Sequence, residues 1–180
     1  FTDIARSMIL LLNKAEIEPV ILDQELCCGR DLLWSGEYEA FKALAKKNIE
    51  MISKSGAKTI LTTCPECFRT LKIDYSSVAG KELNVIHASQ FLLELIKSEK
   101  LNIDVKKPPA TRITYHDSCN LGRHMGVYDE PRELLLSLPD VELLEMKKNR
   151  EQAPCCGVSS WLGCDRSAKI EQVNIMNEAK

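Results

Sequence analysis

The stretch KTILTTCPECFRTL (58–71) identifies the fold class, because it joins two different patterns at a cysteine. Its first part, KTILTT (58–63), is short, apolar and β-branched, which predicts a buried strand. Pro65 then stands at a first helical position, and we expect a short helix that runs to about Ile73. A strand that leads directly into a helix is the unit from which parallel α/β sheets are built.

The alternation of strand and helix continues on both sides of this stretch. The expected strands cover 19–23, 83–87, 112–116 and 141–145. The expected helices cover 2–15, 37–54 with Gly56 at its end, 90–98 with Ser89 as N-cap, 130–138 and 165–180. This rhythm predicts an α/β fold with short parallel sheets flanked by helices.

A polar segment with the adjacent prolines Pro108 and Pro109 interrupts the alternation. Two successive prolines cannot continue a helix, so the segment marks a boundary. We therefore expect a first unit over 1–98, a linker over 99–110 and a second unit over 111–180.

Composition narrows the class of protein. The chain has 180 residues, with 24 Lys and Arg against 26 Asp and Glu and a net charge of −2, which argues against a nucleic-acid partner. The apolar share of 44% suits a globular protein. No apolar run approaches the roughly 18 residues of a membrane helix, and no basic secretory start is visible. We expect a cytoplasmic protein without a transmembrane segment, cut from a longer chain because residue 1 is Phe and not Met.

The cysteines form two sets with the same spacing. They are Cys27, Cys28, Cys64, Cys67, Cys119, Cys155, Cys156 and Cys164. Cys-Cys-Gly occurs at 27–29 and again at 155–157. In the first unit 35 residues separate this motif's second cysteine from the Cys-x-x-Cys at 64–67, and in the second unit 35 residues separate Cys119 from Cys155. The units thus share one pattern and are expected to be related by a pseudo-twofold axis; the first lacks a leading cysteine and the second a trailing Cys-x-x-Cys.

This pattern resembles the cysteine-rich CCG domain found in the B-type and D-type catalytic subunits of heterodisulfide reductase. The same domain occurs in the iron–sulfur subunits of glycolate oxidase, lactate-utilisation proteins and anaerobic glycerol-3-phosphate dehydrogenase. YHDSCNLGRHMGVYDEPRELL (115–135) resembles the second motif of the D-type subunits, and LTTCPECFRTL (61–71) resembles the end of their first. Because typical members carry an N-terminal ferredoxin-like region, the resemblance implies that this chain is a C-terminal fragment.

The resemblance also implies a cofactor, ligands and partners. Each unit would hold a noncubane [4Fe–4S] cluster with five cysteines, of which Cys27, Cys28, Cys64 and Cys67 are present for the first and Cys119, Cys155 and Cys156 for the second. The protein would be an oxidoreductase subunit that passes electrons to or from a disulfide, a thiol or a flavin-linked substrate. Its partners would be flavoprotein, ferredoxin-type or membrane cytochrome subunits. We expect the fragment alone to be inactive and poor in iron, because each ligand set is incomplete.

The residues themselves favour a cluster but leave an alternative open. A helix that begins at Cys64-Pro65-Glu66-Cys67 stabilises thiolates, which are the ligands of iron–sulfur clusters. In extended backbone the side chains of adjacent cysteines point apart, so a Cys-Cys pair suits separate irons better than one ion. The alternative is a structural zinc site at Cys27, Cys28, Cys64 and Cys67, in a docking module without redox activity.

Other residues near the cysteines have one functional and one structural interpretation each. His116 is a candidate proton donor to a leaving thiolate, or a structural histidine beside Asp117. We expect His87 to satisfy backbone groups, and Cys164 to be a small buried apolar residue outside both ligand sets.

Overall fold

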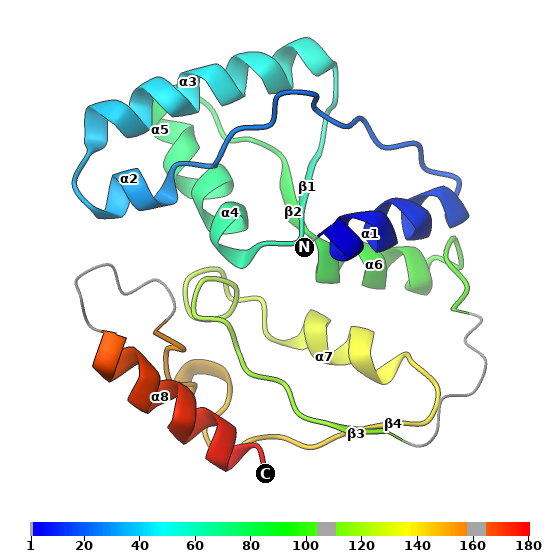
Figure 1. The fold of residues 1–180 in the computed structure, drawn as a ribbon. Coiled ribbons are helices and arrows are strands. Elements are labelled where there is room, and N and C mark those ends of the chain that lie inside the picture. The colour runs from blue at the N-terminus through cyan, green and yellow to red at the C-terminus, as the bar shows by residue number, and fades with distance from the viewer. Residues whose placement is uncertain (1, 104–110, 158–164) are drawn as a thin grey trace. The chain divides into compact units, whose positions relative to one another are not determined.

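The computed structural model describes residues 2–103, 111–157 and 165–180 (Figure 1). The chain divides into two units, Phe1–Asp104 and Val105–Lys180. The prolines of the expected linker, Pro108 and Pro109, lie outside the described residues. Each unit contains one two-stranded parallel sheet with helices beside it, so the predicted α/β class is confirmed.

The first unit places its sheet in the middle of a series of helices. Its elements are α1 (Thr2–Lys14), α2 (Arg30–Trp34), α3 (Tyr38–Ser55), β1 (Ile60–Thr62), α4 (Pro65–Arg69), the π-helix η1 (Thr70–Asp74), α5 (Tyr75–Ala79), β2 (Val85–His87) and α6 (Ala88–Lys97). The strands pair in parallel, with Ile60 opposite Val85 and Thr62 opposite His87. Their carboxyl ends therefore lie side by side, at the point where β1 leads into Cys64.

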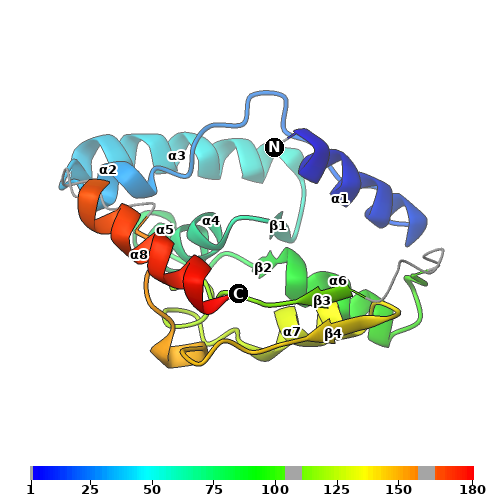
Figure 2. The same ribbon diagram turned by 60° about the horizontal axis from the view of Figure 1, so that its bottom comes forward.

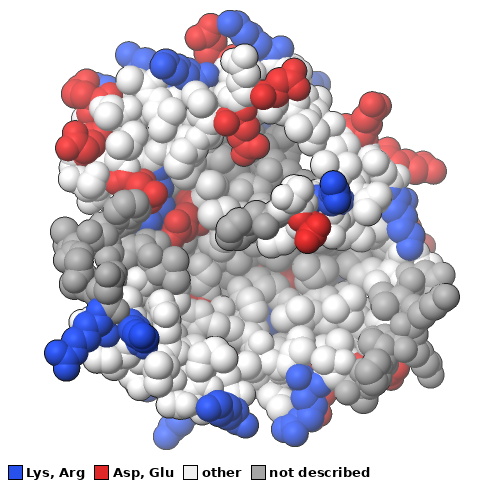
Figure 3. Space-filling view, in the orientation of Figure 1, with Lys and Arg blue, Asp and Glu red and all other residues white. Residues whose placement is uncertain are grey.

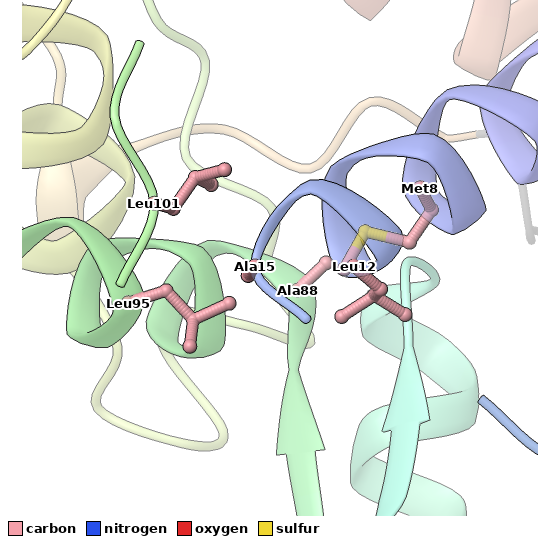
Figure 4. Packing of buried hydrophobic residues seen from close by; sticks show 6 residues of the cluster. All are labelled: Met8, Leu12, Ala15, Ala88, Leu95 and Leu101. Atoms are coloured by element: carbon pink, nitrogen blue, oxygen red, sulfur yellow. The ribbon is translucent and has the colours of Figure 1, made fainter. Parts of the chain in front are cut away.

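One apolar cluster holds α1 against α6 (Figure 4). Its buried members are Met8, Leu12, Ala15, Ala88, Leu95 and Leu101. Burying a Leu or Met side chain contributes about 1.5–3 kcal/mol, so these contacts fix both helices. Leu101 falls within the range expected as linker, yet it is only 3% exposed and belongs to this core.

The helix that follows Cys64 is longer than the sequence indicated. Helices α4, η1 and α5 run without a break from Pro65 to Ala79, and Gly80 ends the run in the left-handed conformation, with φ of 68°. The expected end near Ile73 was wrong because the chain continues through a π turn, which apolar periodicity does not reveal.

Two local predictions for the first unit are wrong. Residues 19–23 form no strand, since Val20 and Ile21 are 58% and 61% exposed and the segment does not pair with β1 or β2. A short apolar run predicts a strand only where a neighbour can pair with it. Ser89 is not the N-cap of α6, because His87 occupies that position and its ring accepts a hydrogen bond from the Ser89 N–H.

The second unit repeats the parallel arrangement in a shorter form (Figure 2). Its elements are β3 (Thr111–Ile113), α7 (Asp129–Leu136), β4 (Val141–Leu143), the 3₁₀ helix η2 (Arg150–Gln152) and α8 (Asp165–Glu178). Thr111 lies opposite Val141, and Ile113 lies opposite Leu143. All four elements predicted for this unit are thus present, with ends that differ by a few residues.

The surface charges and the lengths of the helices agree with what the composition predicted. On the face shown in Figure 3, both basic and acidic side chains lie over the first unit, consistent with their nearly equal numbers in the sequence. Among the residues that the structure describes, no helix has the length and apolar character needed to cross a membrane.

Candidate functional site

A tight turn beside α3 positions the first Cys-Cys pair. Gly29 directly follows Cys27 and Cys28 and adopts a φ of 78°, which favours glycine. A Cβ atom on Gly29 would lie 3.1 Å from Leu44 Cδ2 and 3.2 Å from Phe41 Cδ2. The glycine therefore lets the backbone turn closely against α3.

Cys64 begins the helix that also carries Cys67. It is the N-cap of α4 with Pro65 at the first helical position, as predicted, and its own N–H donates to Thr62 Oγ1 at 3.1 Å. The backbone N–H groups of Cys67 and Glu66 face the Cys64 sulfur and favour its thiolate, although neither forms a full capping hydrogen bond. The positive end of the helix thus lies at a cysteine.

The four thiols of the first unit come together in one place. Cys67 shares hydrogen bonds with the thiols of Cys28 and Cys64, and Cys28 also interacts with the Cys27 thiol. The hydrogen bond with Cys67 outweighs burial and lowers the pKa of Cys28 to about 7 and the pKa of Cys64 to about 6. The hydrogen bonds with Cys28 and Cys64 raise the pKa of Cys67, so this thiol keeps its proton while its neighbours ionise.

The two adjacent cysteines of the first unit differ in their surroundings. Cys27 is exposed, whereas Cys28 is half-buried. Within residues 2–103, 111–157 and 165–180, no three His, Cys, Asp or Glu side chains are arranged around a single-ion site. The donor set itself, several thiols from separate segments with two of them ionised near neutral pH, fits an iron–sulfur cluster.

A buried arginine links the two cysteine segments of the first unit. Arg30 follows Gly29 and is 4% exposed, and its Nη1 lies 3.6 Å from Oε1 of Glu66, between Cys64 and Cys67 in the chain. The guanidinium stacks on Trp34, 4.4 Å from the ring centroid. Its Nε and Nη1 have no hydrogen-bond partner among the described residues. Sequence reasoning missed Arg30, although a cation next to a Cys-Cys-Gly motif was the available signal.

The second unit brings together Cys119, Cys155 and Cys156. Cys119 interacts with both cysteines of the pair and shares a hydrogen bond with Cys155. Burial, followed by the charge of Cys155, raises the pKa of Cys119. All three are free thiols, with Cys155 exposed and the other two half-buried.

The segment that carries Cys119 also holds the loop before the second Cys-Cys pair. His116 Nε2 lies 2.9 Å from the Pro154 carbonyl and donates to it, and Arg123 Nη2 donates to the Ala153 carbonyl at 2.5 Å. These contacts give His116 a structural partner, while its candidate role as a proton donor stays a prediction.

Three further residues near the cysteine motifs were considered from the sequence: His87, Gly157 and Cys164. His87 satisfies backbone as predicted: Nδ1 accepts from the Ser89 N–H at 3.3 Å, and burial lowers its pKa, which keeps it neutral. Gly157 has φ of 73°, and a Cβ there would lie 2.7 Å from Ala168 Cα, so α8 approaches the second Cys-Cys-Gly motif closely. Cys164 lies outside the described residues.

Comparison with known proteins identifies the domain that this arrangement matches. The family model described as a cysteine-rich domain, CCG, matches residues 2–72 and 113–177. Both matched segments contain the cysteine sets described above. No solved structure gives a significant match.

Several curated relatives are oxidoreductases or parts of them. The chain is 42% identical over 153 residues to the D-type subunit of the dihydromethanophenazine:CoB–CoM heterodisulfide reductase of Methanosarcina barkeri, a match that covers 82% of the chain and 37% of the relative. It is 33% identical over 184 residues to the B-type subunit of the fumarate reductase (CoM/CoB) of Methanothermobacter marburgensis, covering 96% and 35%. It is 39% identical over 160 residues to a probable iron–sulfur-binding oxidoreductase of Bacillus subtilis, covering 88% and 22%. The chain thus spans little more than a third of the length of these relatives at most.

Proposed function

Because this chain belongs to the family of cysteine-rich CCG domains, we propose that it is the cluster-binding part of an iron–sulfur oxidoreductase subunit similar to heterodisulfide reductase. The observation that carries the proposal is the meeting of the Cys28, Cys64 and Cys67 thiols, which come from segments 35 residues apart. The pKa values of two of these thiols, Cys28 and Cys64, are lowered to about 7 and about 6, which favours the deprotonation that accompanies cluster binding.

Each unit contributes its own ligand set in this proposal. Cys27, Cys28, Cys64 and Cys67 would be four of the five ligands of a noncubane [4Fe–4S] cluster in the first unit. Cys119, Cys155 and Cys156 would contribute to a second cluster in the other unit. When bound, such a cluster supplies one-electron transfer to or from a sulfur-containing substrate. The chain's own residues supply thiolates, place them at helix starts and tight turns, and keep most of them partly shielded from water.

The net reaction proposed for the whole protein is the interconversion of a disulfide with two thiols. Reduction breaks one S–S bond and consumes two electrons and two protons, and the electrons come from a partner subunit of the flavoprotein, ferredoxin or cytochrome type. The support is that relatives are named as subunits of a heterodisulfide reductase and a fumarate reductase. We further propose that this activity lies in the cytoplasm and that partner subunits bring it to the inner face of the membrane.

Metal analysis with site variants tests the proposal. The full-length protein is purified and reconstituted anaerobically with iron and sulfide, because the ligand sets in this chain alone are incomplete. Iron, acid-labile sulfide and zinc are then measured. We expect iron and sulfide in the wild-type protein and a paramagnetic signal on reduction that shifts when a thiol or disulfide is added. Cys64→Ser should remove the contribution of the first unit and Cys156→Ser that of the second, while Cys164→Ser is the control outside both sets. Stoichiometric zinc without sulfide would instead establish the zinc-stabilised docking module.

A further inference from the structure

A buried pair of polar side chains lies beneath the first Cys-Cys pair. Asn48 belongs to α3 and is 5% exposed, and Tyr75 begins α5 and is fully buried. Asn48 Nδ2 donates to the Cys27 carbonyl at 2.9 Å and to Tyr75 Oη at 2.8 Å. Tyr75 Oη donates to the Cys28 carbonyl at 3.0 Å. The two side chains therefore bind two successive backbone carbonyls, those of both cysteines.

The direction of each of these hydrogen bonds follows from the number of protons. An Asn amide carries two N–H bonds, and Asn48 uses one for the Cys27 carbonyl and one for Tyr75. The single proton of the Tyr75 hydroxyl is then directed at the Cys28 carbonyl. Every donor of the network is used, so neither side chain can turn away without leaving a buried polar group unpaired.

The π turn brings Tyr75 to this position. Phe68 packs edge-on against His87 of β2, with ring centroids 5.8 Å apart, whereas Tyr75 packs edge-on against Phe41 of α3 at 5.9 Å. In a regular α-helix, residues seven apart share one face. The π-helix Thr70–Asp74 takes an extra residue per turn and rotates Tyr75 from the side of the sheet to the side of α3.

The same continuous helix thus has two roles in the first unit. It begins with the thiols of Cys64 and Cys67, and three turns later it offers a hydroxyl to the backbone of the Cys-Cys pair. The distance between the two cysteine segments then depends on one rigid element and not on a loop. Site residues held on helices are positioned more precisely than residues held on loops alone.

We propose that Asn48 and Tyr75 are positioning residues of the first cysteine site, which hold the Cys27–Cys28 backbone against the helix of Cys64 and Cys67 before a cluster binds. The inference rests on the proposed function in that the positioned thiols are cluster ligands. Neither side chain contacts the cluster in this role. Each acts on the backbone of a ligand and leaves the thiol free.

The test uses Tyr75→Phe, which removes only the hydroxyl group. Amide hydrogen exchange of residues 26–34 is measured by mass spectrometry in the reduced, iron-free protein, together with the rest of the first unit. We expect exchange in this segment to become about tenfold faster, because the Cys28 carbonyl loses its donor and Asn48 Nδ2 loses one of its two acceptors. Exchange in α3 and α6 should change less than twofold. Tyr38→Phe makes the same change on a 45% exposed side chain and should leave exchange of residues 26–34 unaltered.

A second variant keeps the test independent of the tyrosine. Asn48→Leu has a similar shape but no donors, so it should accelerate exchange of residues 26–34 at least as much as Tyr75→Phe. Both variants should load a smaller fraction of cluster than wild type at limiting iron and sulfide, by several-fold. Exchange of residues 26–34 that matches the Tyr38→Phe control, or that rises equally across the whole first unit, would overturn the positioning role. A full-length wild-type protein that takes up no iron and sulfide refutes the proposed function, and the exchange measurement still decides the positioning.

Discussion

Arg132→Met would break a buried ion network in the second unit. The Arg132 guanidinium donates to both carboxylate oxygens of Asp117 at 2.7 Å and to those of Glu145 at 2.6 and 3.0 Å. It also donates to the Tyr128 carbonyl at 2.8 Å. The side chains of Arg132 and Asp117 are 6% and 2% exposed, whereas that of Glu145 is 39% exposed. The substitution therefore leaves one carboxylate buried and one able to reach water.

The size of the effect follows from the buried carboxylate. Removing one partner of a buried ion pair costs about 3–5 kcal/mol, because the other charge stays desolvated. Asp117 would keep one hydrogen bond, from the Arg150 N–H at 2.6 Å, and Glu145 would be solvated at little cost. Methionine fills part of the space of the arginine stem. We expect the free energy of unfolding of this unit to fall by about 3 kcal/mol, a large share of the 5–15 kcal/mol typical of folded proteins.

Arg112→Met is the matched control for this measurement. Arg112 lies in the same unit and pairs with Glu142 at 3.7 Å, but the two side chains are 73% and 64% exposed. Such pairs contribute at most about 1 kcal/mol, so the control should change stability by about 0.5 kcal/mol or less. Urea unfolding followed by hydrogen exchange of residues 111–143 gives the free energy for both variants. A loss for Arg132→Met within 1 kcal/mol of the control, on the scale of exposed pairs, would refute the reasoning.

Three further predictions use other parts of the chain. In the reduced, metal-free protein, the rate of Cys64 alkylation should rise as the pH passes about 6, while Cys67 should react slowly at that pH, because the pKa of Cys64 is lowered and that of Cys67 is raised. Peptide mapping measures both rates, and equal rates would contradict the prediction. In urea unfolding, Gly29→Ala should lower the free energy of unfolding by about 1 kcal/mol more than Gly36→Ala does. Both glycines have a positive φ, but only a Cβ at Gly29 would meet a side chain, that of Leu44 at 3.1 Å. An equal loss in the two variants would show that the Leu44 contact does not matter. Burial opposes ionisation of Asp117, but its hydrogen bonds hold the pKa below the ordinary value. The ionised carboxylate therefore stabilises the folded state fully above about pH 4, and this stabilisation is lost as the pH falls through the lower pKa of the folded state. Asp117→Asn should flatten the acid dependence of unfolding, and an unchanged slope would show that other carboxyl groups cause it.

The parts of the fold that the sequence predicted are those with a local cause. The helix over 37–54 has a clear apolar period and Gly56 at its end, and the structure places α3 at Tyr38–Ser55 with Gly56 at φ of 74°. Parallel pairing followed from the strand–helix order and is confirmed in both sheets. Residues 19–23 failed for the opposite reason: apolar residues suit a strand, but pairing depends on a neighbour that local sequence does not specify.

In the candidate site, the sequence likewise predicted some residues and not others. Equal spacing of the cysteines predicted which thiols meet in each unit, and the structure brings them together, while their role as ligands stays a prediction. The supporting residues had no such signal. Asn48 and Tyr75 are 27 positions apart on two helices, and either fits an ordinary helix face in the sequence. Tyr75 also depends on a π turn, which a period of 3.6 residues cannot indicate.

The two units hold their cysteine pairs by different chemistry, and this difference has a consequence for pH. In the first unit the support comes from an amide and a phenol, which stay uncharged at neutral and acidic pH. In the second unit His116 Nε2 donates to the Pro154 carbonyl at 2.9 Å. Two ionised acceptors hold Arg150 at the start of the segment that leads to Cys155: Asp117 receives its N–H, and Asp129 receives its Nη2 at 2.6 Å. Acid should therefore loosen the second cysteine set while the first keeps its backbone support, and the buried carboxylate of Asp117 contributes to the difference.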